Sequence, residues 1–131
     1  MAEAAAAISV VVYGLDGTDI CSKARNWLDR FGPGYRFVDL RRERPEPEML
    51  KAWAASLGGW DALVDRSGTG WKGLLQQRRN PGSDPEWTLL IREHPEILRQ
   101  PITVTSDGRV AVGFTGGLYE RLLGKGKAKH D

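Results

Sequence analysis

The 131-residue sequence predicts an α/β fold built on a mixed sheet. Its first forty residues carry an apolar β-branched run, a helical pattern and a second apolar run, which is typical of a strand–helix–strand unit with parallel strands. Residues 102–113 carry two short β-branched runs on either side of an Asp-Gly turn, which indicates an antiparallel hairpin. The stretch between these two regions has mainly helical periodicity.

The first predicted strand covers residues 8–13, whose apolar run without polar alternation indicates burial on both faces. A Gly-bearing turn follows, with Thr18 or Asp19 as the N-cap of a helix. The expected buried stripe of that helix consists of Ile20, Ala24, Trp27, Leu28 and Phe31. Gly32-Pro33-Gly34 ends the helix, and residues 35–40 form the second strand.

The middle of the chain predicts short helices. In order, the expected elements are a helix over 46–57, a helical turn over 60–64, a polar loop over 66–70, a helix over 71–77 and a helix over 85–93. Asp84 is the expected N-cap of the last helix, and Pro85 its first residue. Most of the five tryptophans fall on apolar stripes, and core packing is the default expectation for them. Trp71, beside a Gly-rich loop, is the best candidate among them to line a groove.

The element order is a thioredoxin-like arrangement, βαβ then ββα, with a helical insertion between the halves. We expect one domain over residues 1–131. Its parts are a βαβ half at 8–40, an insertion at 41–98, a ββα half at 101–123 that closes on a helix over 118–123, and disordered tails at 1–7 and 124–131.

Composition argues against several classes of protein. A net charge of +2 is too mild to indicate direct nucleic-acid binding. A single cysteine excludes an intramolecular disulfide, and the chain has no His, Cys, Asp or Glu cluster at metal-ligand spacing. The N-terminus lacks the pattern of a signal peptide, and no apolar run has the length of a membrane span. We expect a cytoplasmic monomer without a tightly bound cofactor.

Several stretches carry a resemblance to a known family. Residues 12–28 read V-Y-G-x-x-x-T-D-x-C-x-K-A-R-x-W-L, and the other matching stretches are GWDALV at 59–64, GTGWK at 68–72, HPEILRQPI at 94–102 and VGF at 112–114. The chain resembles the bacterial arsenate reductase / Spx / YffB (ArsC-like) family, and most of all its YffB-type members. The resemblance implies a thioredoxin fold and a redox site at the start of the first helix.

Three positions depart from the family pattern. Thr18 stands where the family has its nucleophilic cysteine, and Cys21 matches the second cysteine of the C-x-x-C form. Gln100 stands where the family has an arginine before its R-P-I proline, and Ser67 aligns with a second arginine. Because these groups would attack or bind an oxyanion, the departures argue against arsenate reduction.

Cys21 is the candidate catalytic residue. A helix N-terminus favours a thiolate, and Lys23 and Arg25 add positive charge nearby. The alternative is a small core residue, because Cys21 lies at the edge of the predicted stripe and Asp19 would oppose a thiolate. Both interpretations are open.

The other candidate residues would bind a substrate or an anion. Thr18 is either a hydroxyl nucleophile or, as we favour, the helix N-cap. Lys23, Arg66, Lys72 and Arg99 would bind an anion or a glutathione carboxylate, or else are scattered surface charges. By resemblance, Pro101 is expected to follow a cis peptide bond beside the site.

Two functions are consistent with the sequence. The first is a thiol-dependent, glutathione-linked reductase that uses Cys21. The second is a non-catalytic or redox-sensing family member that binds a protein partner such as the transcription machinery, since Spx-like members contact RNA polymerase.

Overall fold

β1 (Ile8–Gly14) lies at the centre of the sheet in a computed structural model of the chain. The strand order is β2-β1-β3-β4, so β1 has a neighbour on each side. It pairs in parallel with β2 (Gly34–Asp39) and antiparallel with β3 (Ile102–Thr105), which in turn pairs antiparallel with β4 (Val110–Val112). The predicted mixed four-stranded sheet and its parallel crossover are confirmed.

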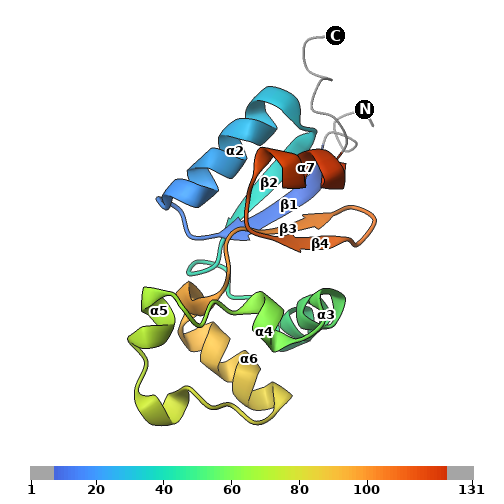
Figure 1. Cartoon of the computed structure of the whole chain (residues 1–131). Coiled ribbons are helices and arrows are strands. Elements are labelled where there is room, and N and C mark those ends of the chain that lie inside the picture. The colour runs from blue at the N-terminus through green and yellow to red at the C-terminus, as the bar shows by residue number, and fades with distance from the viewer. Residues whose placement is uncertain (1–7, 124–131) are drawn as a thin grey trace. The chain divides into compact units, whose positions relative to one another are not determined.

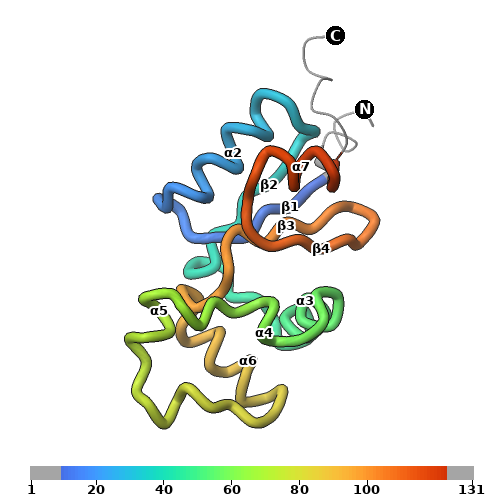
Figure 2. The backbone as a smooth tube through the Cα atoms, in the orientation of Figure 1, coloured from blue at the N-terminus to red at the C-terminus, as the bar shows by residue number. Residues whose placement is uncertain are grey.

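The structure describes residues 8–123, and these fall into two compact units (Figure 1). The first unit contains residues 8–39 and 100–123, and the second contains Leu40–Arg99. The chain leaves the first unit after β2 and returns to it just before β3, as the tube in Figure 2 shows. The predicted tails at 1–7 and 124–131 lie outside the described residues.

Helices α2 (Asp19–Phe31) and α7 (Gly116–Leu123) cover the same face of the sheet (Figure 1). Val10 and Val12 of β1 point into the core that these helices share, together with Ala24, Leu28 and Tyr119. All five side chains are almost completely buried, and burial of a side chain as large as leucine stabilises a fold by roughly 1.5–3 kcal/mol. Val11 is only half-buried, so the expected burial of β1 on both faces holds fully for one face.

The buried stripe of α2 differs from the predicted one at its first position, and two of the predicted members, Trp27 and Phe31, are only half-buried. Ile20 is 36% exposed, whereas Cys21 is 1% exposed and lies in line with Ala24 and Leu28. Successive residues of a helix point in directions about 100° apart. Which of the neighbours Ile20 and Cys21 is buried therefore depends on how the helix packs on the sheet. The helix ends at Gly32, as predicted.

The second unit is helical in its described part. Its elements are α3 (Pro47–Leu57), α4 (Trp60–Leu63), α5 (Thr69–Lys72), the 3-10 helix η1 (Gln76–Arg78), α6 (Asp84–Glu93) and the 3-10 helix η2 (Pro95–Ile97). Gly58 ends α3 in the left-handed conformation, with φ of 98°. An isolated antiparallel bridge joins Val64 to Leu98, next to the end of α4 and to η2.

Three sequence predictions in these regions were imprecise. The helix predicted over 71–77 begins earlier and stops at Gly73, a poor helix former, before the separate η1 turn. Ser83, not Asp84, is the N-cap of α6, because its hydroxyl accepts a hydrogen bond from the backbone N–H of Glu86. α7 begins two residues before the predicted 118, where Thr115 Oγ1 accepts from the N–H of Leu118.

Trp71 does not line a groove. It is 6% exposed and stacks on Trp87, with ring centroids 6.0 Å apart, and Trp60 stacks on Trp87 at 5.7 Å. Trp71 is therefore buried by its packing on the ring of Trp87, although its position next to a loop suggested exposure. No helix between residues 8 and 123 has both the length and the apolar character needed to cross a bilayer.

Candidate functional site

The loop between β1 and α2 carries Thr18 at the start of the helix. Thr18 occupies the N-cap position with extended backbone angles, but its side chain caps no helix N–H group. Its Oγ1 instead donates a hydrogen bond to the carbonyl of Leu15 at 2.9 Å, and its backbone N–H donates to the same carbonyl at 3.3 Å. The predicted N-cap position of Thr18 is confirmed, but its hydroxyl forms no cap hydrogen bond, because it closes the loop on itself.

Cys21 lies in the first turn of α2 and its thiol is closed off from solvent. The residue is 1% exposed, and its Sγ lies 3.7 Å from Oε1 of Gln100, to which the S–H donates. The sulfur also packs on Gly14, where a Cβ would overlap it and would lie 3.5 Å from the Phe37 ring. These contacts match the alternative of a small core residue.

Gln100 connects the thiol to the loop. Its Oε1 accepts the S–H of Cys21 and also the backbone N–H of Leu15, at 3.1 Å. The peptide bond that follows, Gln100-Pro101, is cis, as the resemblance implied, and the carbonyl of Pro101 accepts from the N–H of Gly113 at 2.9 Å. Sequence reasoning noted Gln100 only as a departure from an arginine and did not identify it as the partner of Cys21.

The charged residues of α2 lie on its outer side. Lys23 is exposed two residues after Cys21. Arg25 stacks on the Phe37 ring at 4.4 Å and pairs with Asp16 at 3.6 Å. A hydrogen bond to Tyr35 raises the pKa of Arg25, so this guanidinium is held by its own unit.

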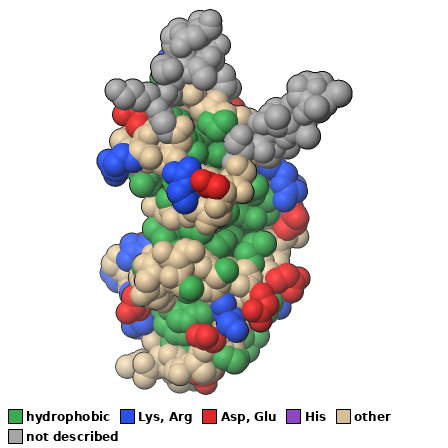
Figure 3. Space-filling model, turned by 90° about the vertical axis from the view of Figure 1, so that its right-hand side faces the viewer, with side chains coloured by type: hydrophobic (Ala, Val, Ile, Leu, Met, Phe, Trp, Pro, Cys, Tyr) green, Lys and Arg blue, Asp and Glu red, His purple; other side chains and the backbone are tan. Residues whose placement is uncertain are grey.

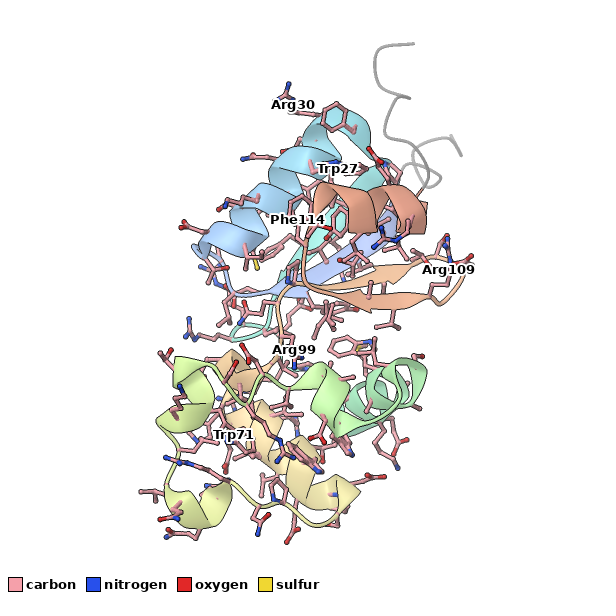
Figure 4. The ribbon with its side chains drawn as sticks, in the orientation of Figure 1. Trp27, Arg30, Trp71, Arg99, Arg109 and Phe114 are labelled. Atoms are coloured by element: carbon pink, nitrogen blue, oxygen red, sulfur yellow. The ribbon has the colours of Figure 1, made fainter. Side chains whose placement is uncertain are left out.

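An aromatic cluster around buried Tyr119 joins α2 and α7. Tyr119 donates to or accepts from Thr103 Oγ1 at 2.7 Å, and the Trp27 and Phe114 rings meet it edge-on at 5.5 and 4.8 Å. Figure 4 shows Trp27 and Phe114 converging from α2 and from the segment before α7. Burial raises the pKa of Tyr119 to about 12, so the phenol is neutral at ordinary pH.

The three remaining candidate cations, Arg66, Lys72 and Arg99, belong to the second unit. Arg66 pairs with Asp61 at 2.7 Å, and its guanidinium lies over the Trp71 and Trp87 rings at 5.1 and 5.4 Å. Lys72 is exposed, and its backbone carbonyl accepts from Arg79 at 2.7 Å. Arg66 is thus held by contacts inside its own unit.

Arg99 is an exposed residue at the end of the second unit (Figure 4). Its backbone N–H donates to Leu63 at 2.9 Å. The pKa of Asp65 is lowered, mainly by a hydrogen bond from the Ser67 hydroxyl. The positive charge of Arg99 lowers this pKa further. Across the described residues, no three His, Cys, Asp or Glu side chains gather closely enough to hold a metal ion.

Comparison with known proteins identifies the family. A model of the ArsC family matches residues 13–122. This chain belongs to the ArsC family. An uncharacterized protein of Haemophilus influenzae is 28% identical over 111 residues, which cover 85% of this chain and 96% of that protein.

Solved structures of ArsC relatives have the same fold. The protein YffB is 29% identical with a TM-score of 0.78, and the match covers 88% of this chain and 99% of YffB. An arsenate reductase (ArsC) related protein from Brucella melitensis is 30% identical with a TM-score of 0.66, over 87% of this chain and 93% of that one. An arsenate reductase from Vibrio cholerae, at 23% identity and a TM-score of 0.69 over 88% and 95%, shares the fold. The predicted thioredoxin-like ArsC fold is confirmed.

The surroundings of Cys21 in this family member decide its chemistry. Reactive cysteines are partly exposed in positively charged surroundings. The thiol of Cys21 is instead buried and bonded to a neutral amide, and acidic Asp19 lies two residues before it in the same turn of α2. In this geometry, the thiol is a hydrogen-bond donor inside the fold.

Proposed function

We propose that this chain is a non-catalytic member of the ArsC family that acts by binding a protein partner. The observation that carries the proposal is the buried thiol of Cys21, which donates to Gln100 and packs on Gly14. A thiol buried in that position is not in contact with a dissolved substrate.

The chemistry of arsenate reduction supports the same conclusion. A thiolate must attack the arsenic and displace an oxygen ligand as water. A second thiol must then attack the sulfur of that adduct, so that the As–S bond breaks with its electrons left on the arsenic and the two sulfurs form a disulfide. Thr18 provides a hydroxyl that is already bonded to Leu15, and the single cysteine of the chain cannot form an internal disulfide. Neither described group near the start of α2 fits the role of an exposed nucleophile.

The charge distribution supports a protein partner rather than nucleic acid. Acidic and basic side chains are interspersed over the face shown in Figure 3. The net charge of the chain is only +2. Nucleic-acid binding normally uses a basic patch or stripe. By analogy with Spx-like members, a component of the transcription machinery is the first partner to test, with the protein acting in the cytoplasm as a monomer.

A second candidate function is a glutathione-linked thiol reductase. The observation that favours it is the place of Cys21 in the first turn of a thirteen-residue helix, where N–H groups stabilise a thiolate. In such a reaction, the Cys21 thiolate would attack a substrate disulfide, releasing one substrate thiol and leaving the other substrate sulfur bound to Cys21. One glutathione would attack that substrate sulfur and free Cys21, and a second would attack the resulting glutathione–substrate disulfide, giving the second substrate thiol and oxidised glutathione. This function requires the buried thiol of Cys21 to become exposed.

One pair of assays separates the two functions. Reduction of arsenate and of a small disulfide is followed as NADPH consumption with glutathione and glutathione reductase, for the wild type and for Cys21→Ser. Binding to purified bacterial RNA polymerase is followed by sedimentation with the same two proteins. The proposal expects no turnover above the protein-free rate and equal binding by both proteins. Turnover that Cys21→Ser abolishes, or lack of binding by the wild type, contradicts it.

A further inference from the structure

One oxygen atom joins three separate segments of the first unit. Oε1 of Gln100 lies 3.1 Å from the backbone nitrogen of Leu15 and 3.7 Å from Sγ of Cys21. Leu15 begins the loop after β1, Cys21 belongs to α2, and Gln100 directly precedes the segment that forms β3. The contacts cross 85 and 79 residues of sequence, respectively.

The loop itself is closed by its own hydrogen bonds. Thr18 donates to the carbonyl of Leu15 through both its hydroxyl and its backbone N–H, so the loop's two ends are tied together. Two further bonds tie the closed loop to the sheet. One is the N–H of Leu15 to Gln100, and the other is the exposed N–H of Asp16 to Asp39 Oδ2, at 3.3 Å.

The Gln100 bond is the better protected of these two ties. Leu15 is 4% exposed, so its N–H would lose a partner in a place that water reaches poorly if Gln100 withdrew. Gln100 itself is anchored by its neighbour Pro101, which is buried and accepts from Gly113. The backbone next to Gln100 is therefore held at the sheet, and the carboxamide reaches from there to the loop.

We propose that the carboxamide of Gln100 is a latch that ties the loop of residues 15–18 to the thiol of Cys21 and keeps that thiol out of solvent. This inference rests on the proposed function, in which the thiol of Cys21 is buried and does not react. It identifies the Gln100 hydrogen bonds as the contact that keeps the thiol buried. Release of the carboxamide frees the Leu15 N–H and the Cys21 S–H together, and the thiol then becomes reachable from solvent.

The latch is expected to depend on the hydrogen bonds of the Gln100 carboxamide and not only on the volume of the side chain. Gln100→Leu keeps most of the side-chain volume but removes the acceptor, and Gln100→Ala removes both. Gln76→Leu makes the same chemical change at an exposed position of the second unit and serves as the matched control. Two readouts follow the latch in each protein: the rate of Cys21 alkylation by iodoacetamide, and hydrogen exchange at the backbone amide of Leu15.

Both Gln100 variants are expected to show alkylation and Leu15 exchange at least about tenfold faster than the wild type, because each loses the half-buried acceptor of both hydrogen bonds. The Gln76→Leu protein is expected to match the wild type in both rates. Exchange at the Val12 amide, in the middle of β1, reports global unfolding and is expected to change less than exchange at Leu15.

Three results would overturn the latch. The first is that alkylation of Cys21 is faster in Gln100→Ala but unchanged in Gln100→Leu. The second is that hydrogen exchange at Leu15 is unchanged in both Gln100 variants. The third is that exchange at Val12 is accelerated as much as exchange at Leu15. A wild-type thiol that reacts as fast as a free one is a different result, because it refutes the proposed function itself. A slow wild-type thiol with an equally slow Gln100→Leu thiol refutes only the latch.

Discussion

The hydroxyl of Thr18 donates a hydrogen bond to the carbonyl of Leu15 at 2.9 Å, at the position that the family resemblance assigns to a nucleophilic cysteine. The side chain is half-buried and lies directly before the first turn of α2. A residue in this place closes the loop instead of offering an attacking atom. The strand, loop and helix start are thus present, and the side chain at position 18 has a structural contact.

Thr18→Cys is expected to give the chain a reversible disulfide. The change places a thiol three residues before Cys21, in a C-x-x-C arrangement at a helix start. It also removes the hydroxyl bond to Leu15, which lowers the free energy of unfolding by about 1 kcal/mol. Titration against reduced and oxidised glutathione measures the disulfide, and Thr18→Cys with Cys21→Ser is the control. A failure of the single variant to oxidise internally would show that the scaffold no longer supports the site.

Gly14→Ala is expected to lower the free energy of unfolding by about 1–3 kcal/mol, because the new Cβ would overlap Sγ of Cys21. Urea denaturation measures the loss. In a Cys21→Ala background the sulfur is absent, so the same substitution should cost clearly less. An equal loss in the two backgrounds would mean that the sulfur does not pack on Gly14 as described.

Tyr119→Phe is expected to lower the free energy of unfolding at pH 7 by about 1–3 kcal/mol, since it removes the phenol that pairs with buried Thr103. Thr103→Val alone should cost a similar amount, and the double variant should cost less than the sum of the two. Urea denaturation of the four proteins completes the cycle. Additive losses would contradict a direct Thr103–Tyr119 bond.

The same tyrosine predicts a pH dependence. Its pKa is raised by burial from 10.0 to about 12, so the folded state holds the phenol proton more tightly than the unfolded state does. This contribution to stability is complete below pH 10 and is lost as the pH rises from about 10 to about 12. Since a tenfold difference in proton affinity corresponds to about 1.4 kcal/mol, the loss is on the order of 2 kcal/mol. The wild type should therefore lose more stability than Tyr119→Phe in this window, and parallel pH curves would contradict the assignment.

Arg66 is expected to act in stability rather than in anion binding. Arg66→Ala removes the pair with Asp61 and the stacking on Trp71, and we expect a loss of about 1 kcal/mol. Arg66→Lys keeps the charge but not the planar stacking, so it should recover only part of this loss. Urea denaturation followed by tryptophan fluorescence measures both. Unchanged stability together with weaker glutathione binding would restore Arg66 as an anion ligand.

The sequence predicted the elements whose patterns are local. The β-branched run of β1, the helix that ends at Gly32 and the Asp-Gly hairpin each follow from a few adjacent residues. Choices between neighbours were less secure: Ser83 rather than Asp84 caps α6, and Cys21 rather than Ile20 enters the core. In both cases the competing residues are adjacent and both chemically suitable, so docking of the helix decides.

The contacts of the candidate site could not be read from local pattern. Cys21 and Gln100 are 79 residues apart, and only the folded sheet brings β3 next to β1. The family resemblance drew attention to both residues and correctly implied the cis peptide bond before Pro101. It identified Gln100, however, only as a residue that replaces an arginine of the family. That the amide oxygen accepts from the thiol and from Leu15 depends on side-chain placement, which neither spacing nor composition encodes.

The rate at which iodoacetamide alkylates Cys21 between pH 7 and pH 9 tests the central claim most directly. The native protein is compared with the same chain unfolded in urea and with a small free thiol. A buried thiol bonded to Gln100 predicts alkylation at least about tenfold slower in the native protein than in either reference at every pH. A native rate equal to or faster than that of the free thiol at pH 7 would contradict the account, because Cys21 would then be an accessible nucleophile.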